Sequence, residues 1–339
     1  MNFKLTVSHY QLPLKYPFTI SRHTVHMQET LIVSISDGTI TGYGEATANP
    51  YYGITIQKLK ASIKSVRAEI ESQKGAHPET LWHHLEPKLR HDYFALCAID
   101  CAYWDYFARK NKRTLRSFWN NGESNLPKTN YTIGIDEIPV MTEKVKQKPW
   151  PIYKIKLGME NDLEIVEALR NATDAVFRID ANCAWEVDEA IQKSKALKAL
   201  GVEFIEQPLK AENWDGMSML KKESALPFIA DESCKTLEDV AKCAEVFDGI
   251  NIKLMKCGGI TPALKMIEKG RALGLKVMLG CMTESTIGIS NLVQLAPLLD
   301  YIDADGAMLL ASDIASGVQF QNGTVLYPKD FGSGAKLLL

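Results

Sequence analysis

Three acidic side chains follow three consecutive short β-forming runs in the middle of the chain. Asp180 follows the run Val-Phe-Arg-Ile, Glu206 follows Phe-Ile, and Asp231 follows Phe-Ile-Ala. Carboxylates that converge on one point repel each other unless a cation joins them. A ligand set made only of oxygen atoms favours magnesium over zinc. The sequence therefore predicts a magnesium site, with Asn182 as a second oxygen-bearing side chain at the end of the first run.

Lysines precede and follow this acidic series. Lys154 and Lys156 lie two positions apart in the preceding run, so they point to the same side of a strand, and Lys253 ends the run that follows. A lysine can act as a base at neutral pH when nearby positive charge and desolvation lower its pKa. Two lysines on opposite faces of one carbon could remove a proton from one side and return it on the other, which inverts the stereocentre.

From Thr129 onward, short strands alternate with amphipathic helices through eight strands. This pattern predicts a (β/α)8-type barrel, in which the chemistry takes place at the carboxyl ends of the strands. Lys156 and Lys253 would then lie four strands apart, and therefore across the mouth of the barrel from each other. A helix over about 237–246 is expected to have Thr236 as its N-cap.

The N-terminal part has a different pattern. Residues 1–47 alternate apolar and polar side chains in the manner of antiparallel strands, with a hairpin around Asp37-Gly38. The segment 19–27 is predicted to be a loop between the first strand and that hairpin. Helices are predicted over about 56–72 and 92–110, and apolar residues cover most of the circumference of the second, which predicts burial on several sides.

Composition narrows the functional class. The chain of 339 residues can form two domains or one large α/β domain. Its net charge of −2 gives no indication of a nucleic-acid or membrane partner. The N-terminus has no long apolar leader and the cysteine spacing indicates reduced thiols, so a cytoplasmic protein is expected. All seven histidines precede residue 92, which argues against a Ser-His-Asp triad or a histidine zinc site on the strands.

The motifs together resemble those of the enolase superfamily, in particular its muconate-lactonizing-enzyme subgroup. They are Lys154-Ile-Lys156, Asp180-Ala-Asn182, Glu206-Gln-Pro208, Asp231-Glu232-Ser233, and Lys253 with Gly258-Gly259. The resemblance implies Mg²⁺ as the cofactor, held by the three acids. It implies Lys156 and Lys253 as the acid/base pair, with Asn182 and Glu232 in supporting positions.

The same resemblance implies the fold and its division. The expected fold is a modified TIM barrel, (β/α)7β, with an α+β capping domain. Residues 1–125 would form the capping domain, completed by the C-terminal tail from about 315 to 339. Residues 126–314 would form the barrel that carries the catalytic residues. The oligomeric state stays open at this point, and a homo-oligomer is compatible with the sequence.

Asp303-Ala-Asp305, at the end of the eighth strand, is similar to the Asp-x-Asp feature of the dipeptide epimerases, in which two acids hold the α-ammonium group of the substrate. A cationic amine needs buried carboxylates of this kind. Met282 and Glu284 also follow that group's pattern, and Lys154 joins them as a substrate-binding residue. The resemblance therefore implies magnesium-dependent epimerisation of a dipeptide, by 1,1-proton transfer at the α-carbon of the C-terminal residue through an enolate.

The substrate side chain is harder to predict. Arg22 could pair with a distal carboxylate, as expected for L-Ala-D/L-Glu or a similar Xaa-Glu dipeptide, whereas Leu14, Phe18 and Ile20 could equally line an apolar pocket. The alternatives in the same subgroup are an o-succinylbenzoate synthase and an N-acylamino-acid racemase, which use the same lysines and metal without an ammonium-binding acid pair. A lysine Schiff-base lyase and a non-catalytic barrel fit less well, because three acids cluster and every metal and lysine position is present.

Overall fold

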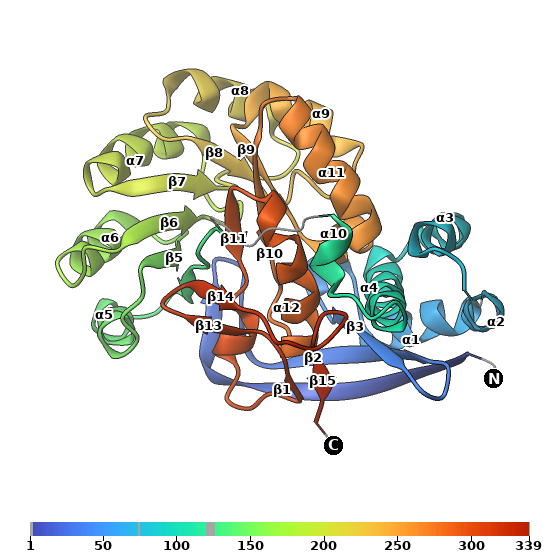
Figure 1. The fold of residues 1–339 in the computed structure, drawn as a ribbon. Helices are drawn as coiled ribbons and strands as arrows, with labels where there is room; N and C mark the ends of the chain where they lie inside the picture. Colours follow the sequence, from blue (N-terminus) through green and yellow to red (C-terminus); the bar gives the residue numbers. More distant parts are fainter. Residues whose placement is uncertain (1–2, 74, 120–125, 339) are drawn as a thin grey trace.

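A parallel barrel forms the centre of the computed structural model, which describes residues 3–73, 75–119 and 126–338 (Figure 1). Its eight strands pair in chain order. They are β4 (Tyr131–Ile133), β5 (Ile152–Lys156), β6 (Val176–Asp180), β7 (Val202–Glu206), β8 (Phe228–Ala230), β9 (Gly249–Ile252), β10 (Lys276–Gly280) and β11 (Tyr301–Asp303). A parallel bridge between Thr129 and Ile302 joins the first strand region to the last. The barrel is therefore nearly closed, and its carboxyl strand ends meet at one mouth.

Helices lie outside the strands and follow the first seven of them. They are α5 (Ile138–Gln147), α6 (Asp162–Arg170), α7 (Val187–Ala199), α8 (Trp214–Glu223), α9 (Asp239–Val246), α10 (Leu254–Cys257) with α11 (Ile260–Ala272), and α12 (Thr286–Leu292) with η3 (Val293–Leu298). Only the short 3-10 helix η4 (Gly306–Leu309) directly follows β11 in the described residues. The predicted (β/α)7β barrel is confirmed. Thr236 does not cap α9, because the Asp239 carboxylate accepts the Thr236 amide and the helix begins at Asp239.

The N-terminal residues form an antiparallel sheet of β1 (Lys4–Ile20), β2 (His23–Ser36) and β3 (Thr41–Thr47). The prediction of a loop over 19–27 is wrong, because the β1–β2 ladder continues through Phe18↔Val25 to Ile20↔His23. β-branched side chains favour this pairing. Only Ser21 and Arg22 form the turn, so Arg22 lies at the tip of a long paired hairpin.

Helices cover one face of this sheet (Figure 1). They are α1 (Ile56–Ser65), α2 (Arg67–Ser72), α3 (Pro78–Leu89) and α4 (Tyr93–Lys110), with the short 3-10 helices η1 (Pro50–Tyr52) and η2 (Leu115–Phe118) beside them. The predicted helix over 56–72 is divided at Val66, which leaves the helical conformation. The predicted helix over 92–110 is confirmed, and the Asp92 carboxylate caps it by accepting the Ala95 amide.

Two buried carboxylates join this N-terminal part to the barrel. Glu45 on β3 accepts the Ser285 amide at 3.0 Å and the Gly288 amide at 3.0 Å, at the start of α12. Asp100 on α4 accepts the amide of Thr261, at the start of α11, at 2.9 Å. Helix N-termini carry unpaired amides and partial positive charge, so a carboxylate is a fitting partner. The N-terminal sheet is thereby held over the mouth of the barrel.

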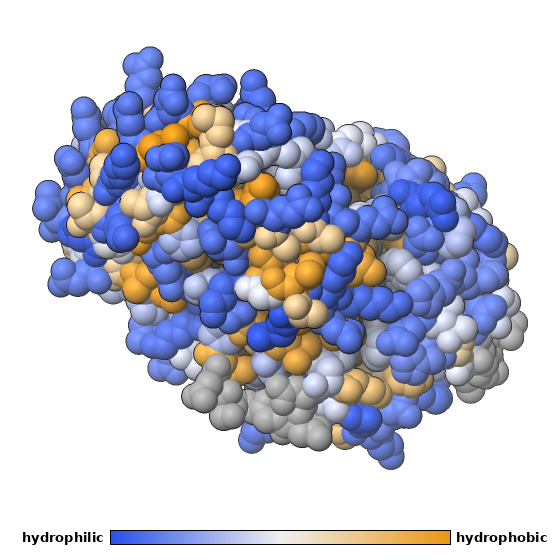
Figure 2. All heavy atoms as spheres, turned by 90° about the horizontal axis from the view of Figure 1, so that it is seen from above, coloured by the Kyte–Doolittle hydropathy of each residue, from blue (hydrophilic) through white to orange (hydrophobic). Residues whose placement is uncertain are grey.

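The C-terminal tail contacts the same N-terminal region. Its strands are β12 (Ala315–Ser316), which pairs with β15 (Lys336–Leu337), and β13 (Gln319–Gln321), which pairs with β14 (Thr324–Leu326). Asp105 on α4 accepts the Ser333 amide at 2.7 Å, and Arg109 donates to the Ala335 carbonyl at 2.6 Å. The face seen in Figure 2 is mostly hydrophilic, with apolar areas between the polar side chains. None of the helices in the described ranges has the length and hydropathy of a membrane span.

Candidate active site

The three predicted metal-binding acids meet at the mouth of the barrel. Asp180 and Glu206 are register partners at the ends of β6 and β7, and Asp231 directly follows β8. Adjacent parallel strands bring residues in register to the same edge and the same face of a sheet. All three side chains are buried, and one carboxylate oxygen of each lies within 4.8 Å of the other two.

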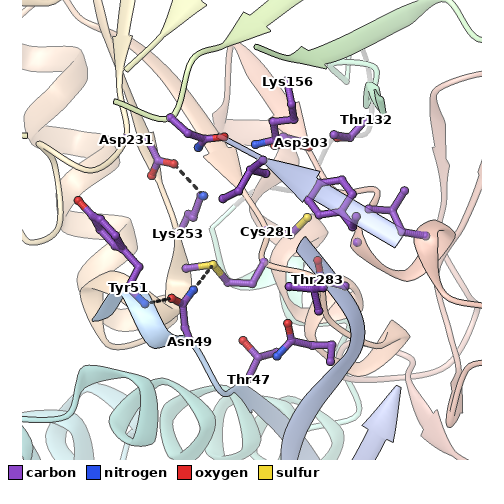
Figure 3. A pocket seen from close by; sticks show the side chains of 18 of the residues that line it. Thr47, Asn49, Tyr51, Thr132, Lys156, Asp231, Lys253, Cys281, Thr283 and Asp303 are labelled. Atoms are coloured by element: carbon purple, nitrogen blue, oxygen red, sulfur yellow. Dashed lines mark hydrogen bonds and ion pairs between the residues drawn. The ribbon is translucent and has the colours of Figure 1, made fainter. Parts of the chain in front are cut away.

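The three predicted lysines contact this acidic cluster through their ammonium groups. Lys156 Nζ lies 2.6 Å from Asp180 Oδ2, and Lys253 Nζ lies 2.8 Å from Asp231 Oδ2. Lys154 Nζ contacts Asp180, Glu206 and Asp303 at 3.0, 2.8 and 2.9 Å. Lys156 ends β5, and Lys253 follows β9, four strands further round the barrel. Figure 3 shows Lys253 beside Asp231, with Lys156 across the cavity near Asp303.

The charges of this cluster determine its pKa values. Burial alone would lower the pKa of Lys253, but the neighbouring Asp231 carboxylate raises it above the ordinary lysine value. Lys154 behaves in the same way because carboxylates surround its ammonium group. Burial and the nearby Asp180 charge raise the pKa of Glu206 to about 7. The ionised forms of these carboxylates are therefore stabilised by the cations that lie among them.

The donor set fits a divalent magnesium ion. It consists of buried carboxylate oxygens on three neighbouring strand ends, without sulfur or imidazole. The nearby Asn182 carboxamide oxygen is buried and has no hydrogen-bond partner among the described residues. Burial is the main cause of the raised pKa of Glu206, and the charge of the neighbouring Asp180 adds to it.

A second pair of acids lies at the end of β11, on the wall of the same cavity. Asp303 accepts from Lys154 at 2.9 Å and from the Asn130 carboxamide at 2.8 Å, whereas Asp305 accepts the Thr132 amide. Burial opposes ionisation of Asp303, but Lys154 lowers its pKa overall. Burial and the Asp303 charge raise the pKa of Asp305 to about 8. This pair is suited to bind an additional cation.

The hairpin tip supplies the outer wall of the cavity. Arg22 donates to Glu232 Oε1 at 2.8 Å and to the Asn182 carbonyl at 3.1 Å. Its guanidinium carbon lies 4.1 Å from the ring centroid of Tyr51. Ile20 lines the cavity beside it. The structure thus brings Arg22 to the predicted site, with its charge paired to a carboxylate of the barrel.

Met282 and Glu284 have different positions. Met282 lines the main cavity, but Glu284 is not among its lining residues in the described chain. The Glu284 carboxylate turns back to accept the Met282 amide at 2.9 Å, and it lines a small separate cavity behind Lys253. The sequence pattern predicted substrate contacts for both side chains, but the turn after β10 directs only Met282 into the main cavity.

Two residues that support the acids were not predicted from the sequence. Lys256 contacts Asp231 Oδ1 at 2.6 Å, and Asn251 donates to Glu206 Oε1 at 2.8 Å. Asn251 lies two positions before Lys253 on β9, so the alternation of a strand could have identified it. Lys256 could not have been found in this way, because it lies in the short helix α10.

Two family models together match most of the chain. Residues 2–118 match the mandelate racemase/muconate lactonizing enzyme N-terminal domain, and residues 140–338 match the enolase C-terminal domain-like model. The first range contains the N-terminal sheet with its helices, and the second contains the barrel from β5 onward with its tail.

Relatives match over nearly their whole length. An L-Ala-D/L-amino acid epimerase from Flavobacterium johnsoniae is 52% identical over 99% of this chain and 100% of its own. An L-Ala-D/L-Glu epimerase from Bacteroides thetaiotaomicron is 36% identical over 95% of this chain and 85% of its own. A crystal structure of a dipeptide epimerase from Enterococcus faecalis, complexed with Mg and the dipeptide L-Leu-L-Tyr, has a TM-score of 0.92 at 30% identity, covering 99% of each chain.

Proposed function

The chain belongs to the mandelate racemase/muconate lactonizing enzyme family of the enolase superfamily, and on this premise we propose that it is a magnesium-dependent dipeptide epimerase. It inverts the α-carbon of the C-terminal residue of a dipeptide with a free amino terminus, L-Ala-D/L-Glu or L-alanine followed by a related residue. The observation that carries the proposal is the pair of lysines, Lys156 and Lys253, that approach one acidic cluster from opposite sides of the mouth.

The two lysines perform the proton transfer. One lysine, as the neutral amine, takes the α-proton from one face, and the other, as the ammonium ion, donates a proton to the opposite face. The roles exchange when the opposite stereoisomer is the substrate, because each lysine faces only one side of the carbon. Lys253 loses the ion pair that raises its pKa once Asp231 binds another cation.

Asp180, Glu206 and Asp231 would hold Mg²⁺, in keeping with their shared oxygen donor set. When bound, the ion neutralises the substrate carboxylate and stabilises the enolate that forms as the α-proton leaves. Asn251 and Lys256 orient Glu206 and Asp231 through the contacts of 2.8 and 2.6 Å.

Asp303 and Asp305 bind the free amino terminus of the dipeptide. Both are buried on the cavity wall, and their mutual repulsion is relieved when an ammonium group lies between them. An N-acylated amino acid has no such cation, so this acid pair favours a dipeptide over the substrates of an N-acylamino-acid racemase or an o-succinylbenzoate synthase.

Deuterium exchange at Cα tests the function directly. The protein is incubated with Mg²⁺ in D₂O with L-Ala-L-Glu, other L-Ala-L-Xaa dipeptides and N-succinylamino acids, and incorporation and stereochemistry are read by NMR and chiral chromatography. We expect exchange and epimerisation at the second residue of the free dipeptides. Faster turnover of N-succinylamino acids than of every free dipeptide would replace the proposal with the racemase alternative.

A further inference from the structure

A buried carboxylate lies just beyond the end of β5 and has no role in the chemistry proposed above. Asp162, the first residue of α6, is fully buried, and it is not among the residues that line the cavity in the described chain. Its Oδ1 accepts the amides of Gly158 and Met159, each at 2.9 Å. These amides lie two and three positions after Lys156. The carboxylate therefore holds the exit of the strand that carries this lysine.

The other oxygen of Asp162 fixes the carboxylate itself. Trp185 Nε1 donates to Oδ2 at 2.8 Å, and Lys193 Nζ donates to it at 2.6 Å. Trp185 lies in the turn after β6 and Lys193 lies in α7, so both partners belong to the next β/α unit of the barrel. A buried carboxylate with donors on both oxygens is held in one position, because a shift would leave a donor or an acceptor unpaired. Asp162 thus ties the exit of β5 to the elements beside it.

Backbone pairing is uneven at the end of β5. In the described residues, β4 pairs with β5 as far as Ile155, whereas β6 pairs with Lys156 itself. Gly158 then turns with a φ of +125°, a conformation that favours glycine, and a Cβ at this position would lie 2.7 Å from the Ala184 Cβ. The chain therefore leaves Lys156 through a tight passage, and the two bonds to Asp162 fix its path.

We propose that Asp162 is a positioning residue for Lys156, and for only this one of the two acid/base lysines. The inference rests on the proposed epimerase function, in which each lysine serves one face of the α-carbon. Lys253 follows β9 on the other side of the mouth, and the chain beyond it is held by a different carboxylate, Asp100, which accepts the Thr261 amide at 2.9 Å. Loss of the Asp162 contacts should therefore displace one lysine and leave the other in place.

Asparagine cannot replace this carboxylate, because one of its two terminal atoms is an NH₂ group that donates and does not accept. In one orientation this group meets the amides of Gly158 and Met159. In the other orientation it meets Trp185 and Lys193, which are donors too. Asp162→Asn should therefore release the exit of β5, and a displacement of a reacting group by about 1 Å costs roughly a hundredfold in rate.

Exchange at Cα, rather than epimerisation, separates the two faces. The equilibrium constant fixes the ratio of the forward and reverse kcat/KM values, so a defect in one lysine slows epimerisation equally in both directions. Loss of the α-proton to D₂O, by contrast, can proceed through one lysine on one face. The initial exchange rate is measured by NMR for the L,L and the L,D stereoisomer of the dipeptide that the wild type turns over fastest, with the magnesium-loaded full-length protein. The stereoisomer that fails to exchange in Lys156→Ala is the one that Lys156 deprotonates.

We expect Asp162→Asn to slow exchange of that stereoisomer about ten- to a hundredfold relative to exchange of the other. Gly158→Ala should produce the same selective loss, because its Cβ displaces the same passage without touching the carboxylate. Asp92→Asn is the matched control. It removes another buried carboxylate at the start of a helix, where Asp92 accepts the Ala95 amide at 3.1 Å, and it should leave the ratio of the two exchange rates within about twofold of wild type.

The ratio of the two exchange rates decides the outcome. An equal fall of both rates in Asp162→Asn overturns the inference, because a general loss of structure or of metal binding affects both faces. A ratio unchanged from wild type overturns it as well. If Asp162→Asn does not fold, Gly158→Ala decides by the same criterion. A wild-type protein that exchanges the α-proton of no dipeptide refutes the proposed function itself, whereas failure of the positioning role leaves wild-type exchange intact.

Discussion

Replacement of Asp305 by asparagine should change how turnover depends on pH. Burial and the Asp303 charge raise the pKa of Asp305 to about 8, so its carboxyl is mostly protonated at neutral pH in the free protein. Binding of the substrate ammonium requires the carboxylate. Because the pKa is raised, the binding-competent form is depleted below about pH 8 and is gained as the pH rises through that value.

The magnitude follows from the distance between the pH and the pKa. At about pH 7, a carboxyl with a pKa of about 8 is ionised in roughly one molecule in eleven, which costs about 1.4 kcal/mol. The ionisation of Asp305 alone should therefore raise the wild-type kcat/KM for a free dipeptide about tenfold between that pH and the plateau at high pH. Asp305→Asn has no carboxyl to ionise, and loss of one charge-assisted contact should lower kcat/KM by roughly ten- to a hundredfold at high pH.

The assay must separate Asp305 from the substrate, whose own amino group titrates near the same pH. The ratio of wild-type to Asp305→Asn kcat/KM removes the substrate term, because both proteins are given the same dipeptide. We expect this ratio to rise with a single ionisation near pH 8. A ratio that is flat between about pH 6.5 and 8.5 would refute the assignment of Asp305 as an ammonium-binding carboxylate with a raised pKa.

Three further outcomes are expected. Chelation of divalent ions should abolish Cα exchange, and added Mg²⁺ should restore it. Asp231→Asn should weaken the Mg²⁺ affinity measured by calorimetry, and an undiminished affinity would contradict the role of Asp231 as a ligand. Lys156→Ala and Lys253→Ala should each abolish epimerisation. Each variant should still exchange the α-proton of one stereoisomer in D₂O, and the stereoisomer should differ between the two variants. Epimerisation at the wild-type rate in both variants would exclude the two-lysine scheme. Glu45→Gln should destabilise the protein by about 1–3 kcal/mol in denaturant unfolding, because its carboxylate accepts amides at the start of α12, and an unchanged midpoint would contradict that role.

The arrangement of acids and lysines could be predicted because it depends on local order. A short β run ends at or directly precedes each of the three predicted metal ligands and each of the two predicted acid/base lysines, and the alternation of strands with amphipathic helices predicts a barrel. In any such barrel the carboxyl ends meet at one mouth. Asp180, Glu206 and Asp231 were therefore expected together, and their oxygens do lie within 4.8 Å of one another.

The sequence did not predict the tip of the β1–β2 hairpin, because its residues show no clear alternation of buried and exposed positions. Val25 is partly buried between exposed neighbours, His23, Thr24 and His26, so no apolar alternation marks this stretch. The pairing Phe18↔Val25 is decided instead by the continuation of the β1–β2 ladder. The position of Arg22 follows from that ladder.

The sequence by itself therefore determined the strand ends, the types of the side chains that we propose to be catalytic, and their order around the barrel. Only the tertiary structure decided which groups meet across distant segments. Arg22 reaches Glu232, 210 positions away, and Glu45 reaches Ser285, 240 positions away. No periodicity encodes such contacts, because a paired carboxylate and a solvated one have the same local sequence signal. Their partners are fixed by the closed barrel and by the sheet held over its mouth, where burial makes an unpaired charge costly.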